Sequence, residues 1–232
     1  MFDRRGVLFW PVGTGDSTSF VIEPDEVIFQ VDLRHTVKSE DEETDGAPIV
    51  DKLLEHLPRV AGRPYLSAFA LSHPDKDHIQ GFQQLLDNSD IGELWFSPWI
   101  FRESDDEGLC EDAIVFRTEA HRRVDATIAA GGDPGSGDRV RLIGHDPLLQ
   151  EDHYQNFPRQ FLTIPGNSVT MIDGIERLVT SFCHSLGHDA AHIHDIALGA
   201  LLHDIGKMRV NLGVLNKPAK LSDDEFVHMK SH

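Results

Sequence analysis

The residues that most constrain the fold are Tyr65–Leu71, a near-continuous apolar run of strand length. A strand without alternating polar residues is typical of a sheet that is covered on both faces. Just before it, apolar residues recur at helical spacing over Ile49–Leu57, and Pro58 ends the pattern. Strands that alternate with helices in this way predict an α/β layer architecture.

Further elements of both kinds follow from the hydrophobic periodicity and the turn residues. The expected strands are Gly6–Phe9, Ser19–Ile22, Val27–Asp32, Leu94–Phe96 and Val140–Ile143. The expected helices are Gly81–Leu86 and Glu111–Ala130. The longer helix should bury Ile114, Val124 and Ile128. From about residue 175 onward the pattern is helical, so we expect two regions, 1–175 and 176–232.

The balance of charge limits the partners of the chain. Lys and Arg total 21 against 39 Asp and Glu, a formal net charge of -18. So acidic a surface argues against non-specific nucleic-acid binding and against membrane binding. The N-terminal apolar run ends at Pro11, too early for a signal peptide or a membrane span, and Cys110 and Cys183 lack the spacing of a disulfide scaffold or zinc ribbon. We therefore expect a cytoplasmic protein.

A first cluster of potential metal ligands follows the apolar strand directly. His73, Asp75, Asp77 and His78 fall within six residues, and a loop that leaves a strand can turn such side chains into one cleft. Imidazole and carboxylate together suit a two-metal site, where a bridging water is deprotonated near neutral pH. The alternative is a solvated polar loop that caps the next helix. The complete H-x-D-x-D-H pattern at a strand end favours metal binding.

This segment resembles the H-x-[HD]-x-D-H signature of metallo-β-lactamase-fold hydrolases. The closest variant is the one in the nuclease domains of DNA-uptake competence proteins and related bacterial metallohydrolases. Val12–Ser17 and the strand that ends in Asp32 also match the opening of that group. The resemblance implies that all four residues of the first cluster are metal ligands, and that Asp77 is also catalytic because it orients the attacking water.

The resemblance covers about residues 6–175 and predicts only a partial metallo-β-lactamase-like region, one αβ half of the fold. The later ligands of that fold come from its second half. His145 is a candidate for the next His ligand and Asp173 for a later acidic ligand, although each is equally well an ordinary surface residue. If the second half is missing, the metal site is incomplete.

A second cluster lies near the C-terminus, where His203 and Asp204 end an apolar helix and Lys207 follows one turn later. An adjacent imidazole and carboxylate can bind one metal ion, while the lysine can contact a phosphate. The alternative is a helix C-terminus that Gly206 caps. The continuation of the sequence over Val214–Phe226 favours the metal site.

The run from Leu198 onward resembles the HD-GYP family of HD-domain phosphohydrolases, known for cleaving cyclic di-GMP. The resemblance implies a metal dyad of His203 and Asp204 and a catalytic phosphate contact from Lys207. It also implies two further metal ligands, His184 and His232.

The likeness to that family covers about residues 176–232 and has gaps. His184 and His203 lie closer together than in the family, so three nearby residues are alternatives to His184: His188, His192 and His194. The family's Gly-Tyr-Pro loop and later ligands do not follow in the sequence. We therefore expect a truncated all-α HD-domain fragment that does not hydrolyse cyclic di-GMP efficiently on its own.

Both resemblances agree on metal-activated water, so the leading hypothesis is a metal-dependent hydrolase of phosphoester bonds. The expected substrate is a small phosphoester, a cyclic dinucleotide or a nucleic-acid-related phosphodiester. Zinc, manganese and iron all suit the ligand sets. Two alternatives stay open: a catalytically inactive regulatory or interaction protein, and two partial modules without a joint function. Incomplete modules also leave apolar faces uncovered, which predicts homo-oligomers.

Overall fold

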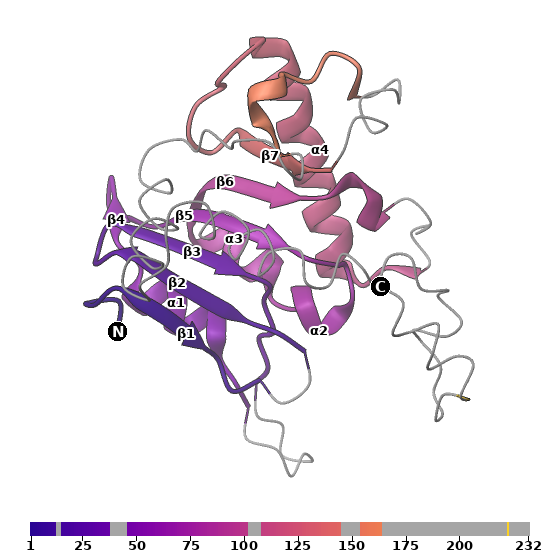
Figure 1. Ribbon diagram of the computed structural model, residues 1–232. Helices are drawn as coiled ribbons and strands as arrows, with labels where there is room; N and C mark the ends of the chain where they lie inside the picture. The colour runs from indigo at the N-terminus through magenta and orange to yellow at the C-terminus, as the bar shows by residue number, and fades with distance from the viewer. Residues whose placement is uncertain (13–14, 38–45, 102–107, 145–153, 164–221, 223–232) are drawn as a thin grey trace.

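The computed structural model describes residues 1–12, 15–37, 46–101, 108–144, 154–163 and 222. They form a mixed sheet with helices packed against it (Figure 1). The strands are β1 (Gly6–Phe9), β2 (Thr18–Glu23), β3 (Val27–Val31), β4 (Arg59–Val60), β5 (Arg63–Leu71), β6 (Asp90–Phe96), β7 (Arg139–Ile143) and β8 (Leu162–Thr163). The α-helices are α1 (Ile49–His56), α2 (Lys76–Ile79), α3 (Phe82–Asn88) and α4 (Glu111–Ala130). Two 3-10 helices are η1 (Pro98–Phe101) and η5 (Arg159–Phe161).

The strand order places the ends of β3 and β5 side by side. The order is β1-β2-β3-β5-β6-β7-β8, and β4 pairs with β5 outside this path. The pairs β1–β2 and β2–β3 are antiparallel, whereas β3, β5, β6, β7 and β8 are parallel neighbours. Because parallel strands end at the same edge of a sheet, the residues that follow β3 and β5 meet there.

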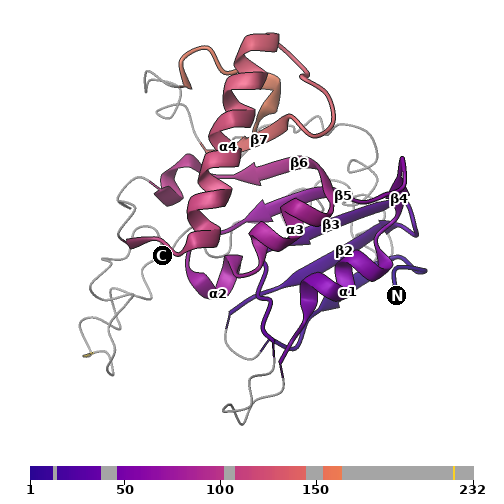
Figure 2. The same ribbon diagram turned by 180° about the vertical axis from the view of Figure 1, so that it is seen from behind.

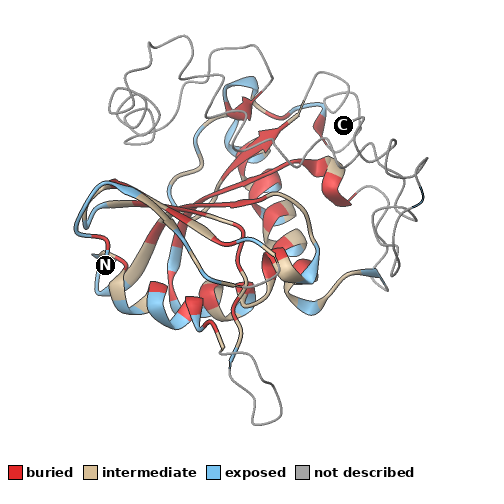
Figure 3. Cartoon of the chain, turned by 60° about the horizontal axis from the view of Figure 1, so that its bottom comes forward, coloured by how far each residue is buried: buried red, intermediate tan, exposed pale blue. Residues whose placement is uncertain are grey.

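The central strand β5 is buried on both faces, as its apolar sequence predicted. Phe69 is fully buried beneath the helices, with its ring centroid 5.1 Å from that of Phe82 on α3 and 6.0 Å from that of Phe116 on α4. Ala68 and Ala70 belong to a second apolar cluster on the opposite face. Figure 2 shows α1, α3 and α4 together on one face of the sheet. Figure 3 shows the buried residues gathered along the central strands and the sheet-facing sides of the helices.

The structure corrects the buried side expected for α4. Its bounds are those predicted, and Val124 is fully buried, but Ile114 and Ile128 are only half-buried. The other residues that α4 buries are Ala113, Phe116, Ala120, Arg123 and Thr127. A charged side chain lies on this buried face because its charge is satisfied there: Arg123 donates to Glu119 at 2.7 Å and to the carbonyl oxygen of Ile91 at 3.0 Å.

The α/β prediction is confirmed for the described residues. The expected boundary near residue 175 and the all-α segment lie outside them, as do His145 and Asp173. The metallo-β-lactamase-like assignment therefore stays a prediction. In the part of the chain that the structure describes, no helix combines the length and apolar character needed to cross a membrane.

Candidate metal centre

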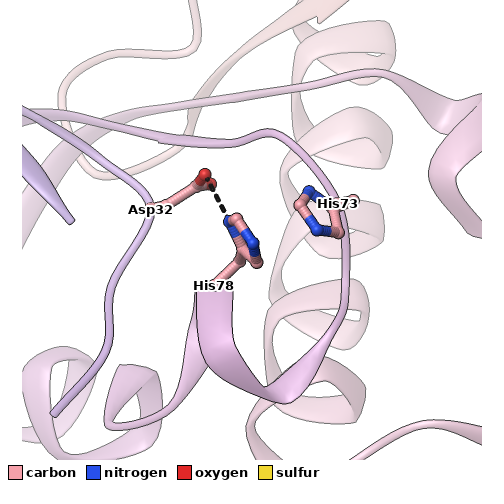
Figure 4. Close-up of side chains that lie close together, drawn as sticks. All are labelled: Asp32, His73 and His78. Carbon is pink, nitrogen blue, oxygen red and sulfur yellow. Dashed lines mark hydrogen bonds and ion pairs between the residues drawn. The ribbon is translucent and has the colours of Figure 1, made fainter. Parts of the chain in front are cut away.

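Three potential metal ligands converge at the shared edge of β3 and β5 (Figure 4). Asp32 follows β3, His73 follows β5, and His78 lies on α2. The candidate ligand atoms of these three side chains all lie within 4.8 Å of one another. Asp32 and His78 are buried, whereas His73 is partly exposed. This arrangement suits a divalent metal ion, because carboxylate oxygens and imidazole nitrogens are common metal ligands in proteins.

Backbone hydrogen bonds hold α2 against the chain that leaves β3. Leu33 N donates to the carbonyl oxygen of His78 at 2.7 Å, and His35 N donates to that of Gln80 at 2.8 Å. Asp32 itself has a φ of 51°, in the left-handed region that Asp tolerates better than most residues. This conformation ends β3 at Val31, one residue earlier than the sequence predicted.

The Asp32 carboxylate is a hydrogen-bond acceptor for both sides of the site. Its Oδ1 accepts from the Ser72 backbone N–H at 2.8 Å. Its Oδ2 lies 2.5 Å from Ser72 Oγ and 2.9 Å from His78 Nδ1. Ser72 Oγ lies in turn 2.9 Å from His73 Nδ1. The three residues named in Figure 4 are therefore linked into one network through Ser72.

The two other acids of the first cluster lie at its solvent side. The side chains of Asp75 and Asp77 are 51% and 42% exposed. Asp75 Oδ2 lies 3.6 Å from His73 Nε2, and Asp77 Oδ2 lies 3.9 Å from His78 Nε2. Two ligands that share a tetrahedral metal ion lie roughly 3.4 Å apart. Each histidine therefore has a carboxylate near chelating distance, and the structure brings all four predicted residues together in two pairs.

The negative charges around His78 favour a cation at this site. Burial alone would lower the pKa of His78, but the hydrogen bond and charge of Asp32, with the charges of Asp77 and Asp16, outweigh it. The pKa of His78 therefore lies above its ordinary value. Such a surplus of negative charge stabilises a proton in the metal-free protein, and it would stabilise a metal ion in the same way.

The chain just before β2 lies against the segment that contains the candidate ligands His73–His78. Gly15 has a φ of +85°, and a Cβ added there would lie 2.1 Å from the carbonyl oxygen of Asp77. No side chain fits in this space, so only glycine allows the close approach. Gly15 belongs to the Val12–Ser17 segment, which is part of the metallo-β-lactamase resemblance.

Sequence reasoning missed two members of the network. Asp32 was noted only as the end of a strand, and Ser72 only as part of the loop. The available signal was an acid at the carboxyl end of a neighbouring strand, but its use requires knowledge that β3 and β5 are adjacent and parallel. The predicted residues of the second cluster lie outside the described part of the chain: His184, His203, Asp204, Lys207 and His232.

Comparison with known proteins gives one short match among curated sequences. The chain is 50% identical over 40 residues to a cyclic di-GMP phosphodiesterase of Pseudomonas aeruginosa, which is 17% of this chain and 10% of that protein. The match thus spans about a tenth of its relative's length. No protein-family model matches the chain, and no solved structure matches it significantly. The short match loosely supports the HD-GYP resemblance, whereas none of these comparisons supports the metallo-β-lactamase resemblance.

Proposed function

We propose that this protein is a metal-dependent hydrolase of phosphoester bonds, with its metal centre at His73, Asp75, Asp77 and His78. The observation that carries the proposal is the convergence of imidazole and carboxylate groups at the end of two parallel strands. The short match to a cyclic di-GMP phosphodiesterase supports a phosphodiester as the substrate.

The residues divide into two binding pairs, His73 with Asp75 and His78 with Asp77. When bound, a divalent ion at such a centre lowers the pKa of a coordinated water toward neutrality. His78 lies on the buried side of the centre. The carboxylates of Asp75 and Asp77 lie on its solvent-exposed side, from which a substrate would approach. Asp77 would also orient the water, the role that the metallo-β-lactamase resemblance assigns to it, and its carboxylate lies at this exposed side. Zinc, manganese and iron are all compatible with mixed nitrogen and oxygen ligands.

The second cluster extends the proposal to the C-terminal region. His203 and Asp204 would form a metal dyad with His184 and His232, and Lys207 would contact a phosphate of the substrate. The support for these roles is the HD-GYP resemblance together with the short match. A small phosphoester such as cyclic di-GMP is therefore the first substrate to assay.

Elemental analysis of the purified protein tests the first centre. Asp77→Ala combined with His78→Ala should lower the bound metal markedly, because each removed group faces the site. The matched control is Asp3→Ala with His56→Ala, which removes the same two residue types away from the centre. Unchanged metal stoichiometry in the Asp77/His78 variant refutes the assignment. Purified protein that neither retains nor binds added metal would instead favour an inactive regulatory protein.

A further inference from the structure

We infer that Asp32 and Ser72 form a hydrogen-bonded bridge that fixes the tautomers of both His73 and His78. In this bridge both imidazoles carry their proton on Nδ1, so both Nε2 atoms present a lone pair to the centre. The inference deepens the proposed function, on which its metal-binding part rests. It assigns Ser72 and Asp32 as positioning residues rather than metal ligands.

The first step concerns His78. An ionised carboxylate can only accept hydrogen bonds. Asp32 Oδ2 lies 2.9 Å from His78 Nδ1, so this nitrogen must carry the proton. Both side chains are nearly fully buried, at 4% and 7% exposure, so water does not compete for the bond. In the neutral ring, Nε2 then holds the lone pair, and it lies on the side of Asp77.

The second step concerns His73, whose tautomer is fixed by the hydroxyl of Ser72. A serine hydroxyl has one proton to donate. The Ser72 hydroxyl donates that proton to Asp32 Oδ2, at 2.5 Å. Ser72 Oγ can therefore only accept from His73 Nδ1, 2.9 Å away, which places the His73 proton on Nδ1. Its Nε2 lone pair lies on the side of Asp75.

The third step concerns Asp32 itself. Its proximity to His73 and His78 makes it a candidate third ligand. However, its two oxygens already accept from the Ser72 N–H, the Ser72 hydroxyl and His78 Nδ1. Metal-bound histidines commonly donate their second N–H to a carboxylate, which fixes the ring and raises its basicity. Asp32 matches that outer role for His78 directly, and for His73 through one hydroxyl.

Nitrogen-15 NMR of the imidazoles in the metal-free protein tests the bridge without reference to activity. The wild-type protein, at a pH where the rings are neutral, should show both His73 and His78 protonated on Nδ1. Ser72→Ala should spread the His73 proton over both nitrogens and leave His78 unchanged. Ser72→Thr, which restores a hydroxyl, should restore the His73 tautomer.

Titration with zinc alone gives the second measurement. Ser72→Ala should weaken zinc binding by about 10- to 100-fold, the usual effect of losing an outer-shell partner, and Ser72→Thr should largely recover it. A wild-type His73 protonated on Nε2 overturns the inference without any variant. So does a Ser72→Ala protein with unchanged tautomer and unchanged zinc affinity. If the wild-type protein binds no zinc but shows the expected tautomers, the proposed metal centre fails while the bridge stands.

Discussion

Asp32 combines two features that single residues seldom share, a positive φ and a buried charge. The φ of 51° turns its carboxylate from the end of β3 toward the neighbouring strand. The hydrogen bonds from Ser72 and His78 then offset the cost of burying the charge. The backbone conformation of Asp32 and the hydrogen bonds of its carboxylate therefore have to be considered together.

Replacing Asp32 with Asn should impair metal binding while leaving the backbone in place. Asn tolerates positive φ, so the loss arises from the carboxylate and not from backbone strain. We expect zinc affinity to fall about 10- to 100-fold and the free energy of unfolding to fall by about 1–3 kcal/mol. Zinc titration and urea denaturation measure the two effects.

Asp25→Asn provides a matched control for that substitution. Asp25 also has a positive φ, 56°, but it is exposed and distant from the site in the sheet. Its replacement should change neither quantity. Equal effects of the two variants would mean that the Asp32 carboxylate has no special role.

A second residue-scale prediction concerns the contact between Gly15 and the segment that contains Asp77. Gly15→Ala places a Cβ 2.1 Å from the carbonyl oxygen of Asp77, so one of the two segments must move. Gly62→Ala has nearly the same φ, +88°, with nothing within 4 Å of the added Cβ. Both variants bear the backbone penalty of about 1 kcal/mol, but only Gly15→Ala should also weaken zinc binding. Equal zinc affinities in the two variants would contradict a role for this contact.

Among the helices and strands, those with a clear hydrophobic period within their own residues were predictable from the sequence. Tyr65–Leu71 and Glu111–Ala130 are long and strongly patterned, and the structure confirms both. The four-residue helix α2 and the two-residue strand β4 are too short to show a period, and neither was predicted. The four candidate ligands of the first cluster could be grouped from the sequence because they lie within six residues. Asp32 could not, since its partner Ser72 is 40 residues away.

The buried side chain of Arg123 on α4 is held by an ion pair within the helix and attaches the helix to the sheet by hydrogen bonds. Arg123 is 2% exposed; its Nε donates to Glu119 at 2.7 Å, and its Nη1 donates to the carbonyl oxygen of Ile91 on β6. Burial alone would raise the pKa of Glu119, but hydrogen bonds from Arg122 and Arg123 outweigh it, so this pKa lies below its ordinary value. The ionised carboxylate therefore stabilises the folded state.

Glu119→Gln should lower the free energy of unfolding at pH 7 by about 1.5–3 kcal/mol, the usual worth of a hydrogen bond to a charged group. A lowered folded pKa contributes stability above the unfolded pKa of about 4.3 and loses it as pH falls through the folded value. The difference from wild type should therefore shrink below about pH 4. Urea denaturation at pH 7 and pH 3 measures the difference in the free energy of unfolding between the variant and the wild type.

The control is Glu55→Gln, which alters an exposed pair with Lys52 and should show little change at either pH. An effect of Glu119→Gln that does not depend on pH would contradict the ion-pair explanation.

At the scale of the molecule, the two faces of the sheet share the same strands. The helix-covered face contains Phe69 and Leu94, and the opposite face contains Trp95 beside a buried pair, Arg141 with Glu93. Burial raises the pKa of Glu93, although the Arg141 charge opposes that shift. The strands β5 and β6 contribute alternate side chains to both faces. Unfolding of the apolar cluster on one face therefore also disturbs the cluster on the other.

We therefore expect the two faces to unfold in a single transition. Trp10→Phe with Trp99→Phe leaves Trp95 as the sole tryptophan of the chain, so its fluorescence reports on the second face. The far-UV circular dichroism of the helices, of which α4 is the longest that the structure describes, reports on the first. Both signals should give the same Tm, because the strands that connect the faces cannot unfold separately. If the chain self-associates, as the incomplete modules predict, this common Tm should rise with protein concentration, and light scattering should detect dimers or larger species. A Trp95 transition well below that of the helices would show that the second face is an independent unit.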